Sequence, residues 1–386
     1  MPKQTKLIFS VEEYQQRLLN LRNEMERRGI EVLISYAPEN IHYMTGYHTP
    51  GYYAYQCLVV PNDEDPFLII RLLEEYNIDE YSWLQGRVTY EDNENPVEVT
   101  AEALKAKGLD KKIIGVEQDA WFFTINEFYQ LKNLLNNANW IDGSKCVEKL
   151  RMVKSKQEIE YIRQAARIAE KGMAVALDAI EEGITEDDIA AITHYELIRN
   201  GGEYTSLPPF ITSGYRTGIG HTTWSGRKIE SGDMLYFEIP GTVNRYSAAL
   251  LRSAYLGDPP AEVLEIADYV VKTLNRAIEV IRPGITSGEA DKTVRSLLNK
   301  TQYGKYYKNR LGYSIGVNFP PNWGEGHFLE LVADDTTVLE PGMVFHVPPG
   351  VVGYNNMGLS LSETILVTED GSEAITNFER EFRIVK

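Results

Sequence analysis

Cysteine, export signals and long apolar runs are what this sequence lacks. Only Cys57 and Cys146 occur in 386 residues, which excludes a disulfide framework and any cysteine-based metal cluster. No apolar run approaches the about 18 residues that span a bilayer, and the opening MPKQTKLIFSVEEY contains no apolar signal core. We therefore expect a reduced, cytoplasmic protein that neither enters a membrane nor is secreted.

Positive charge is also scarce. Lysine and arginine total 39 against 56 acidic residues, which gives a net charge of −17 and a pI of about 4.9. Because such a surface repels phosphate, we expect no nucleic-acid partner. Hydrophobic residues make up 43% and charged residues 25%, a globular composition, and the length favours two domains.

The first part of the chain alternates helix and strand patterns. A capping box at Ser10–Glu13 begins a helix that ends at Gly29. The strand candidates that follow are EVLISYAP, QCLVVP, DPFLIIR and KKIIGVEQ, with helical stretches between them. A second capping box, Ser155–Glu158, begins a long amphipathic helix. We therefore predict a small α/β domain over residues 1–148 and a second domain over residues 149–386.

The second domain carries a faint internal repeat. DAIEEGITEDDI around Gly183 resembles EVIRPGITSGEA around Gly284, and SGDMLYFEIPG after Ser231 resembles EPGMVFHVPPG, with Gly232 matching Gly342. Two units are too few for a solenoid. The pattern predicts a duplicated α+β unit, two helices and a hairpin per half, with a site between the halves; chance similarity of single segments is the alternative.

Four polar residues are candidates for chemistry. Glu238 lies in the apolar run MLYFEIPG, where burial would raise its pKa and prepare it to carry a proton. Glu363 alternates with apolar residues in LSLSETILV, so it is either buried or an edge-strand carboxylate facing water. His221 lies in a glycine-rich loop, a common place for catalytic groups, although a plain surface role is equally compatible. His346 lies inside an apolar strand, where a core histidine is the usual outcome.

Aromatic residues gather in HTPGYYAYQC and in FPPNWGEGHF, which contains Trp323. Such clusters form either a cation-binding box or ordinary packing. No phosphate-binding loop, dinucleotide fingerprint or zinc-type histidine motif occurs in the sequence.

These segments, taken in order, resemble the creatinase/aminopeptidase P superfamily with its pita-bread catalytic domain. The resemblance is carried by LRMVKSKQEIEYIRQAARIAEKGM, the Gly-Ile-Thr turn, ESGDMLYFEIPG, RYSAALLRSAYLG, GYSIGV, LEPGMVFHVPPG and SETILVTEDG. It implies an α+β fold whose C-terminal pita-bread domain has a pseudo-two-fold repeat, preceded by a creatinase-type, RNase H-like α/β domain.

The resemblance also implies a loss of metal ligands. Metal-dependent members use two aspartates, a histidine and two glutamates, and the matching positions here are Glu238, Ala249, Tyr313, Pro348 and Ser362. Only Glu238 remains as a carboxylate, and one carboxylate cannot hold a pair of divalent ions. We therefore expect no metal and no other cofactor, and we disfavour an aminopeptidase or Xaa-Pro dipeptidase activity.

Two metal-free enzyme types in this superfamily are relevant, creatinase and ectoine hydrolase. The two glutamates with which creatinase holds its substrate fall on Leu251 and Ser362, so the sequence is more similar to ectoine hydrolase, a metal-independent hydrolase of a C–N bond in a cyclic amidine. The segment RLLEEYN (71–77) departs from that pattern. The implied roles are catalytic for Glu238, His221 and Glu363, and substrate-binding for four further residues: His346, Tyr313, Trp323 and Glu325.

The resemblance implies a homodimer acting on a small-molecule substrate. Two alternatives stay open at this point. The first is a creatinase-like or related hydrolase acting on another small amidine, guanidine or cyclic amide. The second is a pita-bread protein that binds partners without catalysis, which would not require a polar cluster in the central pocket.

Overall fold

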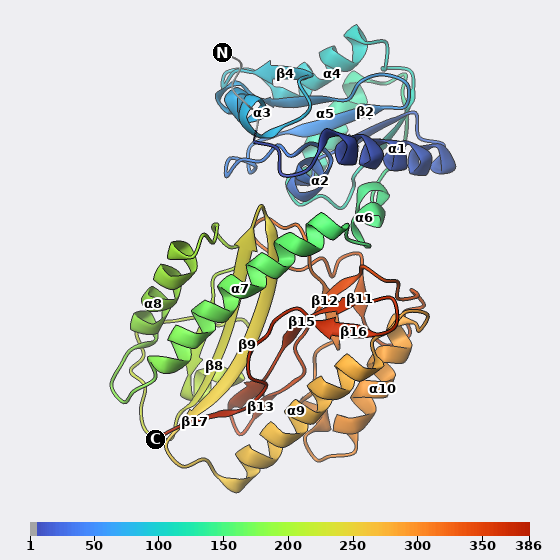
Figure 1. The fold of residues 1–386 in the computed structure, drawn as a ribbon. Helices are drawn as coiled ribbons and strands as arrows, with labels where there is room; N and C mark the ends of the chain where they lie inside the picture. Colours follow the sequence, from blue (N-terminus) through green and yellow to red (C-terminus); the bar gives the residue numbers. More distant parts are fainter. Residues whose placement is uncertain (1–5) are drawn as a thin grey trace. The chain divides into compact units, whose positions relative to one another are not determined.

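A computed structural model describes residues 6–386, and the described chain divides into two compact units between Arg151 and Met152 (Figure 1). The division falls three residues beyond the predicted end of the first domain at 148. No helix within residues 6–386 has both the length and the apolar character needed to cross a membrane.

The first unit is built on a six-stranded mixed sheet in the order β4-β3-β2-β1-β5-β6. Its strands are β1 (Val32–Ser35), β2 (Cys57–Pro61), β3 (Phe67–Arg71), β4 (Arg87–Tyr90), β5 (Ile113–Val116) and β6 (Asn139–Asp142). Its helices are α1 (Val11–Arg28), α2 (Pro38–Thr45), α3 (Glu75–Tyr81), α4 (Pro96–Ala106), α5 (Ile125–Leu134) and α6 (Cys146–Arg151), with a short 3₁₀ turn, η1 (Leu72–Glu74), before α3.

Local signals set these elements. Ser10 Oγ accepts from the backbone N–H of Glu13 to begin α1, and Gly29 ends it with φ +71°. All four predicted strands are present as β1, β2, β3 and β5. The apolar run that contains β1 stops at Pro38, because a proline at the first helical position begins α2.

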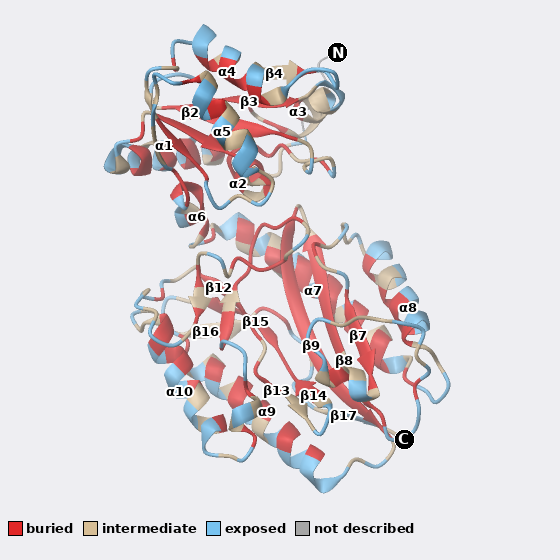
Figure 2. Cartoon of the chain, turned by 180° about the vertical axis from the view of Figure 1, so that it is seen from behind, coloured by how far each residue is buried: buried red, intermediate tan, exposed pale blue. Residues whose placement is uncertain are grey.

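The second unit contains two helix pairs, each packed on its own sheet (Figures 1 and 2). The first half contains α7 (Lys156–Asp178), α8 (Glu186–Arg199), β7 (Phe210–Ser213), η2 (Gly214–Gly218), β8 (Met234–Val243) and β9 (Tyr246–Leu256). The second half contains α9 (Ala261–Val280), α10 (Ser287–Asn299), η3 (Gly304–Tyr306), β10 (Gly312–Ser314), β11 (Glu330–Leu331), β12 (Val344–Val347), β13 (Gly350–Tyr354), β14 (Met357–Ser360), β15 (Glu363–Val367), β16 (Ser372–Ala374) and β17 (Arg383–Val385).

The sheets run β17-β9-β8-β7 and β11-β10-β12-β15-β16, with β13 and β14 as a separate hairpin. Thr364 on β15 joins the two larger sheets, because its Oγ accepts from Ala249 N at 3.1 Å and donates to Ala249 O at 2.9 Å. On the other face, α7 approaches β8 so closely that a Cβ at Gly241 would collide with the carbonyl oxygen of Ala165. The apolar cores therefore lie between helices and sheets, and polar groups such as Thr364 lie where the two larger sheets meet.

The predicted repeat is present in the backbone. Gly183 and Gly284 have φ of +91° and +86°, in the left-handed region that favours glycine. Gly232 and Gly342 likewise have φ of +96° and +91°. Matched residues thus take matched conformations in both halves, as a repeated unit requires.

Candidate functional site

A small cavity of about 130 Å³ opens over the β7–β8 strand pair. Phe210 is the direct partner of Glu238, and Thr212 is the partner of Tyr236. Residues two apart on a strand share a face, so these four side chains lie together and line the cavity. The other lining residues are Thr217, Ile219, Gly220, His221, Thr222, Asn309 and Val352.

Glu238 supplies the only carboxyl group among the lining residues in the described part of the chain. The residue is 7% exposed, and its Oε2 lies 3.5 Å from the donating hydroxyl of Tyr236. Burial raises the pKa of Glu238 to about 8, although the hydrogen bond from Tyr236 opposes this shift. At neutral pH the carboxyl is therefore mostly protonated.

His221 reaches the same cavity from the loop between β7 and β8. Its ring centroid lies 5.8 Å from that of Phe210, and its backbone has φ +55°. A non-glycine residue in this region costs on the order of 1 kcal/mol, so the surrounding loop must hold it there. The structure thus brings His221 and Glu238 to one cavity, and their catalytic roles stay a prediction.

His346, Tyr313 and Trp323 form a hydrogen-bonded chain that lies outside the cavity lining. The indole Nε1 of Trp323 donates to Tyr313 Oη at 2.8 Å, and Tyr313 Oη lies 2.8 Å from His346 Nδ1. On the other side, His346 Nε2 lies 2.6 Å from Ser362 Oγ. In the structure these side chains are bonded to one another, and Trp323 packs against Phe210 with ring centroids 5.5 Å apart. Their expected contact with substrate stays a prediction.

His346 is uncharged at neutral pH. Its burial, together with the nearby charge of Arg310, lowers the pKa of the imidazole to about 3. Nδ1 of His346 lies 3.9 Å from Oε1 of Glu238. Because the pKa of Glu238 is about 8, both groups are neutral near pH 7, and this approach is not an ion pair there.

Glu363 neither lines the cavity nor faces water. Its Oε1 accepts from Arg252 Nη2 at 2.7 Å, its Oε2 accepts from the Thr376 hydroxyl, and Arg380 Nε lies 3.4 Å away. The side chain is fully buried, so of the two alternatives that the sequence left open the buried carboxylate is present and the edge-strand carboxylate facing water is not. Since both oxygens are engaged by partners outside the cavity, we leave Glu363 out of the chemistry proposed below.

Glu325 is likewise committed to a buried ion pair. Its Oε2 accepts from Lys154 Nζ and from Ser314 Oγ, each at 2.8 Å, and both charged side chains are 1% exposed. This arrangement ties the start of the second unit to the segment that carries Tyr313 and Trp323. Glu325 thus supports this segment, and its expected contact with substrate stays a prediction.

Comparisons with known proteins agree with this architecture. Residues 160–369 match the model of metallopeptidase family M24, and residues 17–153 match the creatinase/prolidase N-terminal domain. The chain belongs to metallopeptidase family M24.

Among M24 relatives, the ectoine hydrolase of Halomonas elongata is 30% identical over 98% of both chains. The Xaa-Pro dipeptidase of Pyrococcus furiosus is 28% identical, covering 95% of this chain and 99% of its own. The solved structure of the prolidase from Pyrococcus horikoshii OT3 superposes with a TM-score of 0.83 at 26% identity, covering 95% of this chain and 99% of that one. The protein is thus an M24 hydrolase with a creatinase-type N-terminal domain and a pita-bread catalytic domain.

The M24 name implies a metal, and the donor set around Glu238 does not fit one. Within residues 6–386, no three histidine, cysteine, aspartate or glutamate side chains gather into a possible metal-binding group. At the positions matched to ligands, Ala249 offers only a methyl group, and Tyr313 and Ser362 are both bonded to His346. A carboxyl with neutral neighbours of this kind cannot hold a divalent pair.

Sequence reasoning missed three residues that shape this site. Tyr236 could have been found, because it lies two residues before Glu238 on the same strand face. Asn309 lines the cavity from a segment with no motif. Glu186, which holds the loop that carries His221, follows Thr185 in the repeated Gly-Ile-Thr turn, where the other half has Ser287.

Proposed function

We propose that this protein hydrolyses a C–N bond in a small cyclic amidine, most directly by opening the ring of ectoine, and that its own side chains do so without a metal ion. The observation that carries the proposal is the carboxyl of Glu238 in a small cavity whose described lining contains no other carboxyl group and no lysine or arginine. The name and near-complete coverage of the Halomonas elongata relative support the choice of substrate.

An amidinium group suits this cavity on electrostatic grounds. A bound cation favours the ionised form of Glu238 and thereby lowers the raised pKa of the carboxyl. The carboxylate and the two amidine nitrogens can then form paired, charge-assisted hydrogen bonds. The rings of Phe210 and Tyr236 line the cavity beside Glu238, and aromatic faces attract a cation.

Ionised Glu238 would take a proton from a water molecule whose oxygen attacks the amidine carbon, or would attack that carbon itself, in which case a water molecule then hydrolyses the covalent adduct and returns the carboxylate. Breaking the C–N bond then requires a proton on the departing nitrogen. His221 is the proposed donor, because it lines the cavity and an imidazole can both accept and release a proton. His346 is unsuited to this step, because a pKa of about 3 leaves its ring neutral near pH 7, without the acidic proton of an imidazolium.

In the deciding experiment the purified protein is treated with a chelator, and elemental analysis confirms that no metal remains. Ring opening of ectoine is then followed by proton NMR. Appearance of acetylated diaminobutyrate from metal-free protein supports both the substrate and the mechanism. Absence of product with ectoine, together with cleavage of an Xaa-Pro dipeptide after manganese is added, would overturn the proposal in favour of the activity that the prolidase relatives carry in their names.

A further inference from the structure

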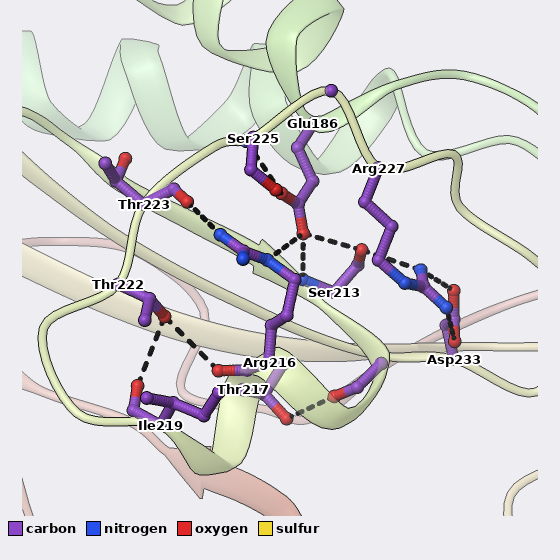
Figure 3. Close-up of polar contacts among 12 residues, drawn as sticks. Glu186, Ser213, Arg216, Thr217, Ile219, Thr222, Thr223, Ser225, Arg227 and Asp233 are labelled. Atoms are coloured by element: carbon purple, nitrogen blue, oxygen red, sulfur yellow. Dashed lines mark hydrogen bonds and ion pairs between the residues drawn. The ribbon is translucent and has the colours of Figure 1, made fainter.

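The loop that brings His221 to the cavity is closed at its base by a buried carboxylate on another element. Glu186, the first residue of α8, is 0% exposed. Its Oε1 accepts from the backbone N–H and the hydroxyl of Ser213, both at 2.8 Å. Its Oε2 accepts from the backbone N–H of Ser225 at 3.0 Å and from the Ser225 hydroxyl at 3.3 Å (Figure 3). Ser213 and Ser225 are the two stems of the loop, so Glu186 joins them.

We call the bonds of Glu186 to Ser213 and Ser225 the clamp. Further hydrogen bonds within the loop extend from it. Arg216 directs Nε toward Glu186 Oε1 at 3.3 Å and donates from Nη2 to the carbonyl oxygen of Thr223 (Figure 3). Thr222 Oγ1 donates to the carbonyl oxygens of Arg216 and Ile219, each at 3.2 Å. Thr222 directly follows His221, so the left-handed backbone of His221 is held between residues that the clamp fixes.

We propose that Glu186 is a positioning residue that places His221 at the cavity. Glu186 lies outside the cavity lining and acts only through the loop. The inference rests on the proton-donating role proposed for His221, and it extends the functional site to α8, an element with no group in the cavity.

The chemistry of the clamp requires a carboxylate. The two backbone N–H groups meet different oxygens of Glu186, and neither N–H can reverse its direction. In Glu186→Gln, one side-chain oxygen becomes an NH₂ group. Either orientation of the amide then sets a donor against a backbone donor and leaves that buried N–H without an acceptor. The conservative substitution therefore opens one stem of the loop while keeping the size of the side chain.

A neighbouring residue gives a matched control. Asp187 is exposed and accepts from Gly226 N at 2.6 Å, one residue beyond the Ser225 stem. Asp187→Asn removes the same charge from the same helical turn but does not touch the clamp. We expect Glu186→Gln to lower kcat about 10- to 100-fold, the scale of an ångström-sized misplacement of a catalytic group, and Asp187→Asn to leave kcat unchanged.

The double variant Glu186→Gln/His221→Ala separates positioning from general weakening of the fold. If Glu186 acts through His221, its substitution has no further effect on kcat once His221 is gone. An equal loss in the presence and absence of His221, or an equal loss in Asp187→Asn, would overturn the inference while leaving the proposed hydrolysis intact.

Hydrogen exchange tests the clamp independently of any substrate. Amides of residues 214–225 should exchange faster in Glu186→Gln than in the wild type or in Asp187→Asn, and unchanged exchange would refute the clamp. This readout stands even if wild-type protein fails to open ectoine, which would refute the proposed function alone. Should Glu186→Gln not fold, Ser225→Ala removes one hydroxyl donor to Oε2, keeps the backbone N–H and should give a smaller effect in the same direction.

Discussion

The first half of the second unit, from α7 to β9, and the second half, from α9 onward, begin with the same helix–turn–helix. In each, a threonine caps the second helix through a complete capping box, Thr185 with Asp188 and Thr286 with Glu289. Each threonine also forms an isolated bridge to a later segment, to Lys228 in one half and Val338 in the other. The two helix–turn–helix segments are therefore equivalent in their capping boxes and in the bridges of their threonines.

Their side chains are not equivalent. The first half supplies nine of the eleven lining residues, including Glu238 and His221, whereas the second half supplies only Asn309 and Val352. Behind the cavity, the second half contributes an uncharged network in which Tyr313 and Ser362 engage both nitrogens of His346. The comparison teaches that a duplicated backbone can be kept while one half lines the cavity with a carboxyl and an imidazole and the other half contributes mainly side chains that are bonded to one another outside the lining.

The largest loss of turnover should come from a substitution in the first half, which carries Glu238. Glu238→Gln removes the group proposed to attack carbon or activate water, and we expect turnover to fall about 10²- to 10⁴-fold. The variant should keep its fold, because a neutral amide resembles the protonated carboxyl that the empty cavity already holds. Steady-state assays with ectoine and circular dichroism measure the two properties, and turnover within about threefold of wild type would remove Glu238 from the reaction.

Glu238→Gln, which should lower turnover, should raise the free energy of unfolding at high pH. The pKa of Glu238 rises from 4.5 to about 8 in the folded protein, so the native state holds this proton over a pH range in which the unfolded chain has lost it. Folding is therefore progressively penalised as pH rises from about 4.5 to 8, by at most about 5 kcal/mol in the fully ionised state. Glu238→Gln should thus gain stability relative to wild type at pH 9 but not at pH 4, as urea denaturation at both pH values would show.

Substitution of the histidine in the first half should also lower turnover more than substitution of the histidine in the second half. We expect His221→Ala to lower turnover about 10²-fold, the usual contribution of a positioned proton donor, and to alter the pH dependence of kcat. We expect His346→Gln to cost less turnover and to leave that pH dependence in place, because His346 stays neutral near pH 7. A larger loss in His346→Gln, with a changed pH profile, would assign the proton transfer to the second half.

The parts of this arrangement that sequence could predict are those set locally. Capping boxes, strand runs and the paired glycines depend on neighbouring residues, and the burial of Glu238 follows from the apolar residues beside it. The surroundings of Glu363 depend instead on Arg252, 111 residues away. The alternation that placed Glu363 on a common face with Leu359 also fails, because the chain leaves β14 at Ser360 before β15 begins. Long-range pairing of this kind leaves no periodic signal in a single sequence.

The smallest expected effect is that of substituting Ser287, because the two Gly-Ile-Thr turns differ in the residue that follows the threonine. Ser287 occupies in the second half the place that Glu186 has in the first, and its hydroxyl donates to the carbonyl oxygen of Glu330 and accepts from Val332 N at 3.2 Å. These bonds hold β11, which carries no group that lines the cavity. Ser287→Ala should therefore lower the free energy of unfolding by about 1 kcal/mol, the usual net value of such a bond, without slowing turnover. If Ser287→Ala reduced kcat as much as Glu186→Gln, both turns would position the site, and the division of labour between the halves would be wrong.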